Sequence, residues 1–355
     1  MVDIYFDISN IVKFKIVDNQ NSFTDKIMGD PFQEYENYRS KNIIEDQDLD
    51  FIVNIVDNIE RRENVYIVDD SFYINEGYIY TRGSYKIAKW DIEIIESNGI
   101  CIINIAPNAV ARLFISGFFI DFIIQYVLTQ KGYSIIHSSA VSKCKRSYLF
   151  SGRGGSGKTS IAIRLISSGQ GFEYMGDDFI LIKDGQSLPY FTPLNLFNYN
   201  ISPFLFQKFR KIEKLNFKLK GWIFRMTGGY AKLFTKLNPL LVIPNVSLQP
   251  SEVSTVTIII PKNGDTGFDL KSISKSDAIK YIINNLKMDS WFIPTYFIQY
   301  SYIYPDGSFS KYWDKYYQNL LLNIPESVRF NLVDVPKTMR WDDVINNLKV
   351  GDENE

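Results

Sequence analysis

Residues 152–159 read Gly-Arg-Gly-Gly-Ser-Gly-Lys-Thr and fill every fixed position of the phosphate-binding pattern G-x-x-x-x-G-K-[ST]. The run Ser-Tyr-Leu-Phe at 147–150 is typical of a strand, and residues 160–166 have the apolar spacing of a helix. In that context glycines let successive backbone N–H groups curl around an anion, and the helix start adds the positive end of its dipole. A tight turn without a ligand is the weaker alternative, because all the fixed positions are filled. The segment therefore predicts a strand–loop–helix unit that binds a nucleoside triphosphate.

The residues of this loop are expected to share the binding of the phosphates. Lys158 places a point charge at the β- and γ-phosphates, and the hydroxyl of Thr159 is a ligand for Mg²⁺. A nucleoside triphosphate and Mg²⁺ are therefore the ligands that we expect at this loop. The expected phosphate-binding residues are Gly152, Arg153, Gly154, Gly155, Ser156, Gly157, Lys158, Thr159 and Ser160.

The composition limits the other classes of function. A chain of 355 residues with 45% hydrophobic content can bury a large core, and its length suggests two domains. The 39 Lys and Arg nearly balance the 40 Asp and Glu, so no global field attracts nucleic acid or an anionic membrane. Cys101 and Cys144 are too few for a disulfide framework or a zinc site and fit a reducing cytosol. Because the first residues lack a basic region followed by an apolar core, we expect a cytoplasmic protein without a secretion signal.

The longest apolar stretch, residues 113–128, is predicted to be a buried helix. It contains Asp121 and Gln125 and is shorter than the ~20 residues that a membrane span requires. The helix is expected to start near Asn108 and to end at Gly132.

Three regions follow from the patterns along the chain. Residues 1–105 show period-2 alternation and predict a β-rich N-terminal domain, with strands at 65–68, 78–81, 86–90 and 100–103 and a loop or short helix at 34–50. Its expected role is packing, substrate docking or contact within a homo-oligomer. Residues 106–340 predict an α/β domain, and residues 341–355 are a C-terminal segment with an acidic tail.

The α/β domain has further predicted elements around the loop. A strand at 133–141 and a hairpin at 143–146 lead into the loop strand, and a strand at 172–182 carries two carboxylates at its middle before an Asp184-Gly185 turn. Strands are also expected at 253–260 and 329–335. Ser274 is expected to cap the helix that follows it.

The two carboxylates, Asp177 and Asp178, follow the loop helix where the acidic residue of a nucleotide site belongs. Adjacent strand residues face opposite ways, so two acids on one metal would require an irregular backbone. One could hold the metal through water while the other faces an acceptor. The alternative is a solvated turn. His137 is the single histidine of the chain, and from its position alone a hydrogen-bonded core residue is the ordinary interpretation.

Residues 208–236 are locally basic with interleaved aromatics. The basic residues are Lys208, Arg210, Lys211, Lys214, Lys218, Lys220, Arg225, Lys232 and Lys236, and the aromatics are Phe209, Phe217, Trp222, Phe224 and Tyr230. Three interpretations stay open: a solvated helical face over an aromatic core stripe, a lid or acceptor-docking element that lends Arg225 to the phosphate, and nucleic-acid binding.

The segments at 137–141 (His-Ser-Ser-Ala-Val), 151–160 and 176–179 (Gly-Asp-Asp-Phe) together resemble the kinase domain of the HPr kinase/phosphorylase family. They resemble more closely the HPr-kinase-like proteins, some of which phosphorylate a serine of a ribosomally made peptide. The resemblance is specific over 133–185, extends to about 335 through the order of predicted elements, and does not cover 1–105.

This resemblance implies a P-loop kinase domain of the HPr-kinase and PEP-carboxykinase-like type, a mixed sheet with flanking helices. It places His137 at the active site, assigns Lys158 and Thr159 to phosphate and Mg²⁺, makes Asp178 the base toward the acceptor hydroxyl and gives Asp177 a second metal contact. The bifunctional enzymes carry an acidic ligand after the aspartate pair, but here no Asp or Glu lies between Asp184 and Glu213. Kinase chemistry alone is therefore expected, without phosphorylase activity or recognition of HPr.

The expected function is an ATP- and Mg²⁺-dependent kinase that phosphorylates a hydroxyl, serine in the first place, of a protein or peptide. One alternative keeps the fold and changes the acceptor to a small molecule or to an RNA end. Another is a nucleotide-sensing module that transfers nothing.

Overall fold

The computed structural model describes residues 2–19, 30–97, 99–196, 203–209, 211–226, 235–264, 267–289 and 292–351. The chain divides into two compact units, the first of Met1–Gly132 with Ser290–Gln318 and the second of Tyr133–Asp289 with Asn319–Glu355. This division differs from the boundary expected after residue 105, because the helical segment that follows the strands packs onto them. Phe119 in that segment, for example, lies edge-on against Trp90 at 5.3 Å between ring centroids.

The first unit is built on one mixed sheet. Within the described residues the sheet has eight strands in the order β1-β2-β3-β8-β7-β6-β5-β4. β3 is parallel to β2 and β8, and the other neighbours are antiparallel. The region predicted as a loop or short helix contains two 3₁₀ turns, η1 (Gln33–Tyr38) and η2 (Asp46–Asp48). The strands are β1 (Val2–Ile8), β2 (Val12–Asp18), β3 (Phe51–Ile55), β4 (Tyr66–Asp69), β5 (Phe72–Asn75), β6 (Tyr78–Tyr85), β7 (Ala88–Ser97) and β8 (Ile100–Pro107).

The helix predicted from near Asn108 to Gly132 is interrupted. It consists of α2 (Ala109–Arg112), the π-helical turn η3 (Ser116–Ile120) and α3 (Asp121–Gln130). The predicted start is confirmed, since the Asn108 side chain accepts a hydrogen bond from the Ala111 amide at 2.8 Å. The prediction of one continuous α-helix was wrong, because residues 113–114 form a turn and Ser116–Ile120 adopt a π-helical turn, where the Ser116 hydroxyl donates to the Pro31 carbonyl at 2.6 Å. Among the described residues, no helix has both the length and the apolar character needed to cross a membrane.

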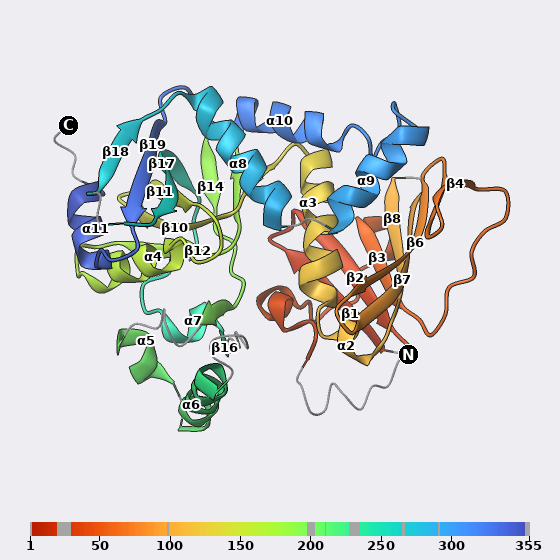
Figure 1. Cartoon of the computed structure of the whole chain (residues 1–355), viewed down its shortest axis with the longest axis horizontal. Helices are drawn as coiled ribbons and strands as arrows, with labels where there is room; N and C mark the ends of the chain where they lie inside the picture. Colours follow the sequence, from red (N-terminus) through yellow and green to blue (C-terminus); the bar gives the residue numbers. More distant parts are fainter. Residues whose placement is uncertain are drawn as a thin grey trace. The chain divides into compact units, whose positions relative to one another are not determined.

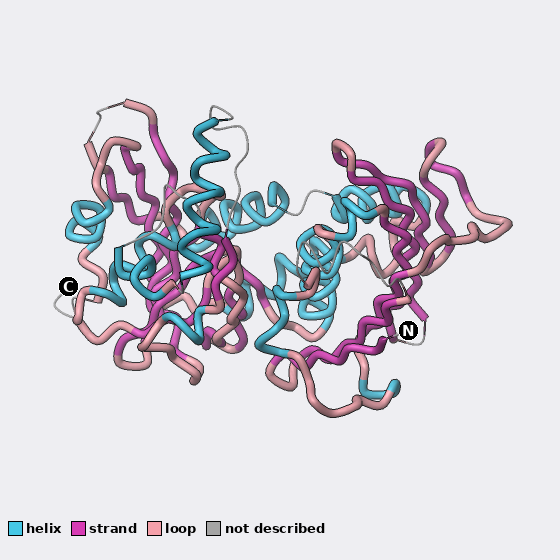
Figure 2. The backbone as a smooth tube through the Cα atoms, turned by 90° about the horizontal axis from the view of Figure 1, so that it is seen from below, coloured by secondary structure: helices cyan, strands magenta, loops and turns pink. Residues whose placement is uncertain are grey.

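Aromatic side chains hold the first unit together. Phe14 stacks between Phe6 and Phe51, with ring centroids 4.7 and 4.5 Å apart. Helix α9 (Phe292–Ile303) returns to this unit and packs on α3 through Phe297 and Phe122, 5.2 Å apart. The helices gather against one face of the sheet (Figure 2).

The second unit contains a mixed sheet with the path β12-β10-β11-β17-β14-β13-β9, extended by β19 beside β17 and β18 beside β19. β11, β17 and β19 run parallel to one another. The strands are β9 (Ser134–Ile136), β10 (Ser138–Lys143), β11 (Arg146–Ser151), β12 (Glu173–Gly176), β13 (Ile180–Lys183), β14 (Gln186–Leu188), β17 (Ser251–Lys262), β18 (Asp269–Ser272) and β19 (Arg329–Pro336).

Helices flank this sheet, so the predicted α/β class with a mixed sheet is confirmed. α4 (Lys158–Ser167) and α11 (Trp341–Leu348) lie beside one another (Figure 1). They share one core, in which Ile161 and Val344 are fully buried. α8 (Lys275–Asp289) packs beside β19, and its expected cap is confirmed because Ser274 Oγ accepts a hydrogen bond from the Asp277 amide at 3.1 Å. Helix α10 (Tyr312–Asn323) begins in the first unit and ends in the second.

A smaller part of the second unit follows β14. It contains the two-stranded sheet β15 (Leu194–Leu196) and β16 (Thr235–Leu237), and the helices α5 (Pro203–Lys208), α6 (Lys211–Met226) and α7 (Pro239–Val242). Leu194 and Phe217 join the core that α4 shares with the main sheet.

Candidate functional site

The phosphate loop joins β11 to α4 in the predicted strand–loop–helix order. A Cβ atom at Gly152 would lie 2.6 Å from the Ile259 carbonyl oxygen, so only glycine fits there. Gly155 and Gly157 have φ of 82° and 97°, a region that glycine adopts without strain. The outer part of the loop is exposed, and added Cβ atoms at Gly154 and Gly155 would meet open space. The loop is therefore an accessible backbone cradle at the start of a helix.

Lys158 folds back across this loop. Its ammonium donates hydrogen bonds to the carbonyls of Gly152 at 2.5 Å and Arg153 at 3.4 Å, and only 6% of the side chain surface is exposed. Ser156 Oγ is also buried in the loop and has no hydrogen-bond partner among the described residues. A cation and a hydroxyl thus converge where an anion on the amide cradle would lie.

Asp177 lies directly against the first turn of α4. The Thr159 hydroxyl is 2.8 and 3.0 Å from its two carboxylate oxygens, and the Ser139 hydroxyl on β10 also donates to it. Asp177 is buried, with 3% of its surface exposed. The structure thus brings together the two residues that were expected to hold Mg²⁺.

The strands on either side of this site are both broken, which corrects two predictions. The strand expected over 133–141 is split at His137 into β9 and β10, and the strand expected over 172–182 is split at Asp177 and Asp178 into β12 and β13. The halves pair with one another, β9 with β13 and β10 with β12, so both breaks lie at the same level of the sheet. Between them the Ser138 amide donates to the Asp178 carbonyl at 3.2 Å.

Asp178 adopts a left-handed conformation, with φ of 66°. This is the irregular backbone that two neighbouring acids at one site require, because it turns successive side chains away from strict alternation. Asn195 on β15 donates from Nδ2 to Asp178 Oδ2 at 3.2 Å. Asp178 is partly exposed, whereas Asp177 is buried.

His137 lies between the phosphate loop and the aspartate pair. Its carbonyl accepts a hydrogen bond from the Ser151 hydroxyl at 2.9 Å, and its ring lies edge-on to Phe179 with 5.7 Å between centroids. Asn285 on α8 reaches the same place, with Nδ2 at 3.2 Å from the Gly152 carbonyl and 3.4 Å from the His137 carbonyl. The structure therefore gathers His137, the loop and the acidic pair in one unit.

Three uncharged residues of this site were not among the predictions: Ser139, Asn195 and Asn285. They come from β10, β15 and α8, far apart in the sequence, and nothing in their local pattern marks them. Ser139 alone had a signal, since it falls inside the segment that carries the family resemblance.

The donor set at Thr159 and Asp177 fits Mg²⁺. The described residues contain no cluster of three or more His, Cys, Asp or Glu that could hold a metal. Magnesium in nucleotide sites takes one or two protein oxygens and fills its other positions with phosphate oxygens and water. One hydroxyl and one carboxylate, side by side at the loop, match this pattern.

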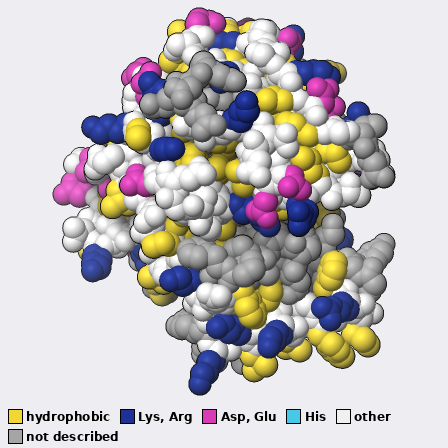
Figure 3. All heavy atoms as spheres, turned by 90° about the vertical axis from the view of Figure 1, so that its left-hand side faces the viewer, with side chains coloured by type: hydrophobic (Ala, Val, Ile, Leu, Met, Phe, Trp, Pro, Cys, Tyr) yellow, Lys and Arg dark blue, Asp and Glu magenta, His cyan; other side chains and the backbone are white. Residues whose placement is uncertain are grey.

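The basic segment forms α5, α6 and β16 in its described parts, whereas Arg210, Tyr230 and Lys232 lie outside the described residues. Phe217 is buried, but 59% of Trp222 is exposed, so the predicted aromatic core stripe is only partly present. Burial lowers the pKa of Lys220 below its ordinary value. In the lower part of Figure 3, hydrophobic side chains lie beside lysines and arginines. The exposed apolar residues of α6 are Leu215, Leu219, Trp222 and Met226.

No family model matches this chain, and no curated protein is significantly similar to it.

Proposed function

We propose that the second unit is an ATP- and Mg²⁺-dependent kinase that phosphorylates a hydroxyl group, serine in the first place, of a protein or peptide. The observation that carries the proposal is the contact of Thr159 with Asp177 at the start of the loop helix, at 2.8 Å. A hydroxyl and a carboxylate held together beside a glycine-rich amide cradle are what a magnesium–triphosphate complex requires.

ATP is the proposed phosphoryl donor, and a bound Mg²⁺ would neutralise charge on its phosphates. The amides of 154–159 and Lys158 bind the phosphates, which requires the ammonium to exchange its bond to the Gly152 carbonyl for a phosphate oxygen. Thr159 and Asp177 hold the metal. The loop amides, Lys158, Thr159 and Asp177 are held by β11, α4 and the break after β12. They are therefore oriented before the reaction begins.

Asp178 is the proposed general base toward the acceptor hydroxyl. Its carboxylate is held by Asn195 and remains partly exposed, so an acceptor has access to it. His137, whose carbonyl is tied to Ser151 at the end of the loop strand, is the proposed positioning residue for the acceptor. In this assignment the buried Asp177 binds the metal, and the more accessible Asp178 accepts the proton of the acceptor hydroxyl.

The surface of α6 supports a peptide as the acceptor. Exposed Leu215, Leu219 and Trp222 lie on a helix that also carries lysines, and an apolar, basic surface suits a segment with apolar and acidic residues. This is the docking interpretation of the basic segment.

The test uses purified protein, ATP labelled at the γ-phosphate, and peptides or proteins encoded beside the gene as acceptors. Asp178→Asn is expected to bind ATP as the parent does and to lose about 10²- to 10⁴-fold in transfer, the usual contribution of a general base. Asp184→Asn is the matched control, because Asp184 also has a left-handed backbone, with φ of 49°, but lies in the β13–β14 turn.

Three results would count against the proposal. Normal transfer by Asp178→Asn would refute the base assignment. Hydrolysis of ATP without any labelled acceptor would favour the nucleotide-sensing module. Saturation by a metabolite alone would favour a small-molecule kinase of the same fold.

A further inference from the structure

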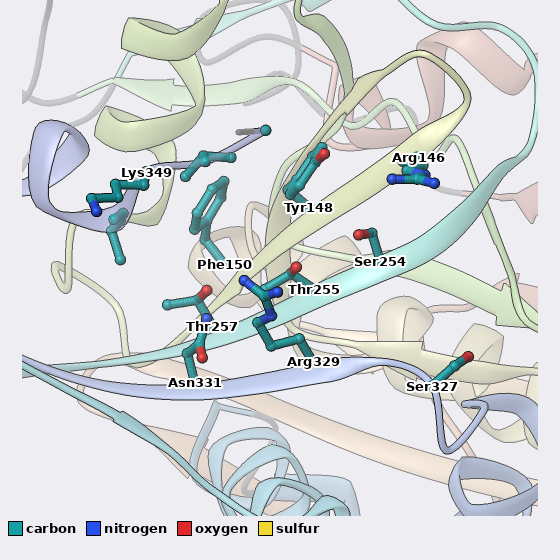
Figure 4. Close-up of a pocket in the computed structure, with 13 residues that line it drawn as sticks. Arg146, Tyr148, Phe150, Ser254, Thr255, Thr257, Ser327, Arg329, Asn331 and Lys349 are labelled. Carbon is teal, nitrogen blue, oxygen red and sulfur yellow. The ribbon is translucent and has the colours of Figure 1, made fainter. Parts of the chain in front are cut away.

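A cavity lies on the sheet of the second unit, apart from the phosphate loop. It has a volume of about 190 Å³, and none of residues 152–160 lines it. Its floor is formed by residues of three neighbouring parallel strands, β11, β17 and β19, and one side is closed by the end of α11 (Figure 4). For comparison, a cavity of about 150 Å³ is large enough for benzene. The cavity can therefore hold a small molecule.

The charged side chains that line this cavity are all cationic. Arg146 comes from the start of β11, Arg329 from the start of β19 and Lys349 from the residue after α11. No Asp or Glu is among the described residues that line it. Figure 4 shows the Arg329 side chain reaching over the sheet toward Thr255, whereas Lys349 lies at the α11 edge with its amino group turned away from Arg329. A lining with three cationic side chains and no acid among its described residues favours an anionic ligand.

The rest of the lining is rich in hydrogen-bonding groups. Hydroxyl and amide side chains come from β11, β17, β19 and the residues just before β19: Tyr148, Ser254, Thr255, Thr257, Ser327 and Asn331. Thr257 is 3% exposed and lies at the floor beside Phe150, which is 1% exposed. Guanidinium groups match phosphate oxygens in a fork geometry, and hydroxyls and amides suit a hydroxylated molecule around the phosphate.

We propose that the cavity between β11, β17, β19 and the end of α11 is a binding site for a small phosphate ester, with Arg329 on the phosphate, Lys349 adding positive charge at the α11 edge, and the hydroxyl and amide side chains on the remainder of the ligand. This site is separate from the proposed nucleotide site and does not depend on it. Arg146, Tyr148 and Phe150 belong to the strand that ends at the phosphate loop, so a ligand here contacts the strand that positions that loop.

The test is isothermal titration at low ionic strength of the full chain with two probes, inorganic phosphate and glycerol 3-phosphate. Arg329→Gln is expected to weaken binding of glycerol 3-phosphate about tenfold, the worth of one charge-assisted hydrogen bond. Lys349→Asn should act similarly, and asparagine suits the left-handed backbone at this position, where φ is 46°. Arg329 and Lys349 are exposed, so neither change disturbs the core.

Two controls locate the effect. Lys145→Gln removes an exposed cation that does not line the cavity and should leave the affinity unchanged. Lys158→Ala disables the phosphate loop and should leave glycerol 3-phosphate binding in place. Parent-like affinity in both cavity variants, or loss of binding in Lys158→Ala alone, would overturn the proposal. Equal affinity for the two probes would overturn the assignment of an ester as the ligand.

Discussion

The glycines of the phosphate loop offer a graded test of its geometry, with Gly157→Ala as the central change. Gly157 has φ of 97°, and a Cβ atom there would lie 1.8 Å from the ring of Trp341, the first residue of α11. Two separate costs therefore apply. A left-handed backbone costs a residue with a side chain about 1–2 kcal/mol, and an overpacked contact costs about 1–3 kcal/mol. We expect Gly157→Ala to lower the stability around α4 by about 2–5 kcal/mol.

The neighbouring glycines separate these costs. Gly155 has φ of 82°, but an added Cβ meets nothing within 4 Å, so Gly155→Ala should cost only the backbone part, about 1–2 kcal/mol. Gly154 lacks a left-handed backbone and also faces open space, so Gly154→Ala should change stability by less than about 1 kcal/mol. Trp341→Ala in the Gly157→Ala background should recover the part that comes from the clash, about 1–3 kcal/mol.

Amide hydrogen exchange, read on peptides from β11 and α4, is the suitable assay because it reports the opening of this unit separately from the other. The double-mutant cycle of Gly157→Ala with Trp341→Ala then gives the coupling between the two positions. If the three alanine variants were equally stable, or if Trp341→Ala gave no recovery, the close approach of α11 to the loop would be wrong.

Three further predictions concern other groups. Thr159→Val should bind ATP in the absence of metal as the parent does, but lose most of the tightening that Mg²⁺ gives; equal tightening in a titration with a fluorescent ATP analogue would contradict the assigned ligand. Burial raises the pKa of the Cys101 thiol, whereas Cys144 is exposed. Iodoacetamide should therefore modify Cys144 much faster than Cys101 at neutral pH. Equal rates of modification, measured by mass spectrometry, would contradict the fold. Hydrogen bonding to Lys280 lowers the pKa of Asp277 below its ordinary 3.8. This contact therefore stabilises the start of α8 above pH 3.8, and the stabilisation is lost as the pH falls through the lowered pKa. Amide hydrogen exchange in the first turn of α8 should accelerate over that range, and it should accelerate less in Lys280→Gln.

Elements with a complete local signal could be predicted from the sequence. The loop motif fixed β11 and α4, and apolar runs bounded by polar residues indicated β17 and β19 within a few positions. The start of α8 was also readable, because Ser274 and Asp277 form a cap at the expected spacing.

The membership of 290–318 in the first unit could not be predicted. This segment follows α8 in the chain, yet its aromatic residues complete the core on α3, as Phe297 does against Phe122. A local sequence pattern indicates that a helix has an apolar face, but it does not indicate which sheet that face will cover. The same limit explains why the boundary expected after residue 105 differs from the division after Gly132.

The breaks at His137 and at the aspartate pair had no local signal either, since apolar residues continue on both sides and each segment has the pattern of one strand. The pairing of the strands accounts for the breaks: Ile136 is opposite Ile180 and Ala140 is opposite Gly176, and residues 137–139 form no regular ladder with residues 177–179.

These breaks also explain how two adjacent carboxylates can serve one site. On a straight strand, an inward Asp177 against Thr159 would send Asp178 to the opposite face of the sheet. Because Asp178 takes a left-handed backbone, its side chain is instead held by Asn195 while Asp177 keeps its contact with the loop helix. The motif supplies the loop, the lysine and the threonine locally. The placement of the acids depends on which strands pair, and that pairing is set by residues far away in the chain.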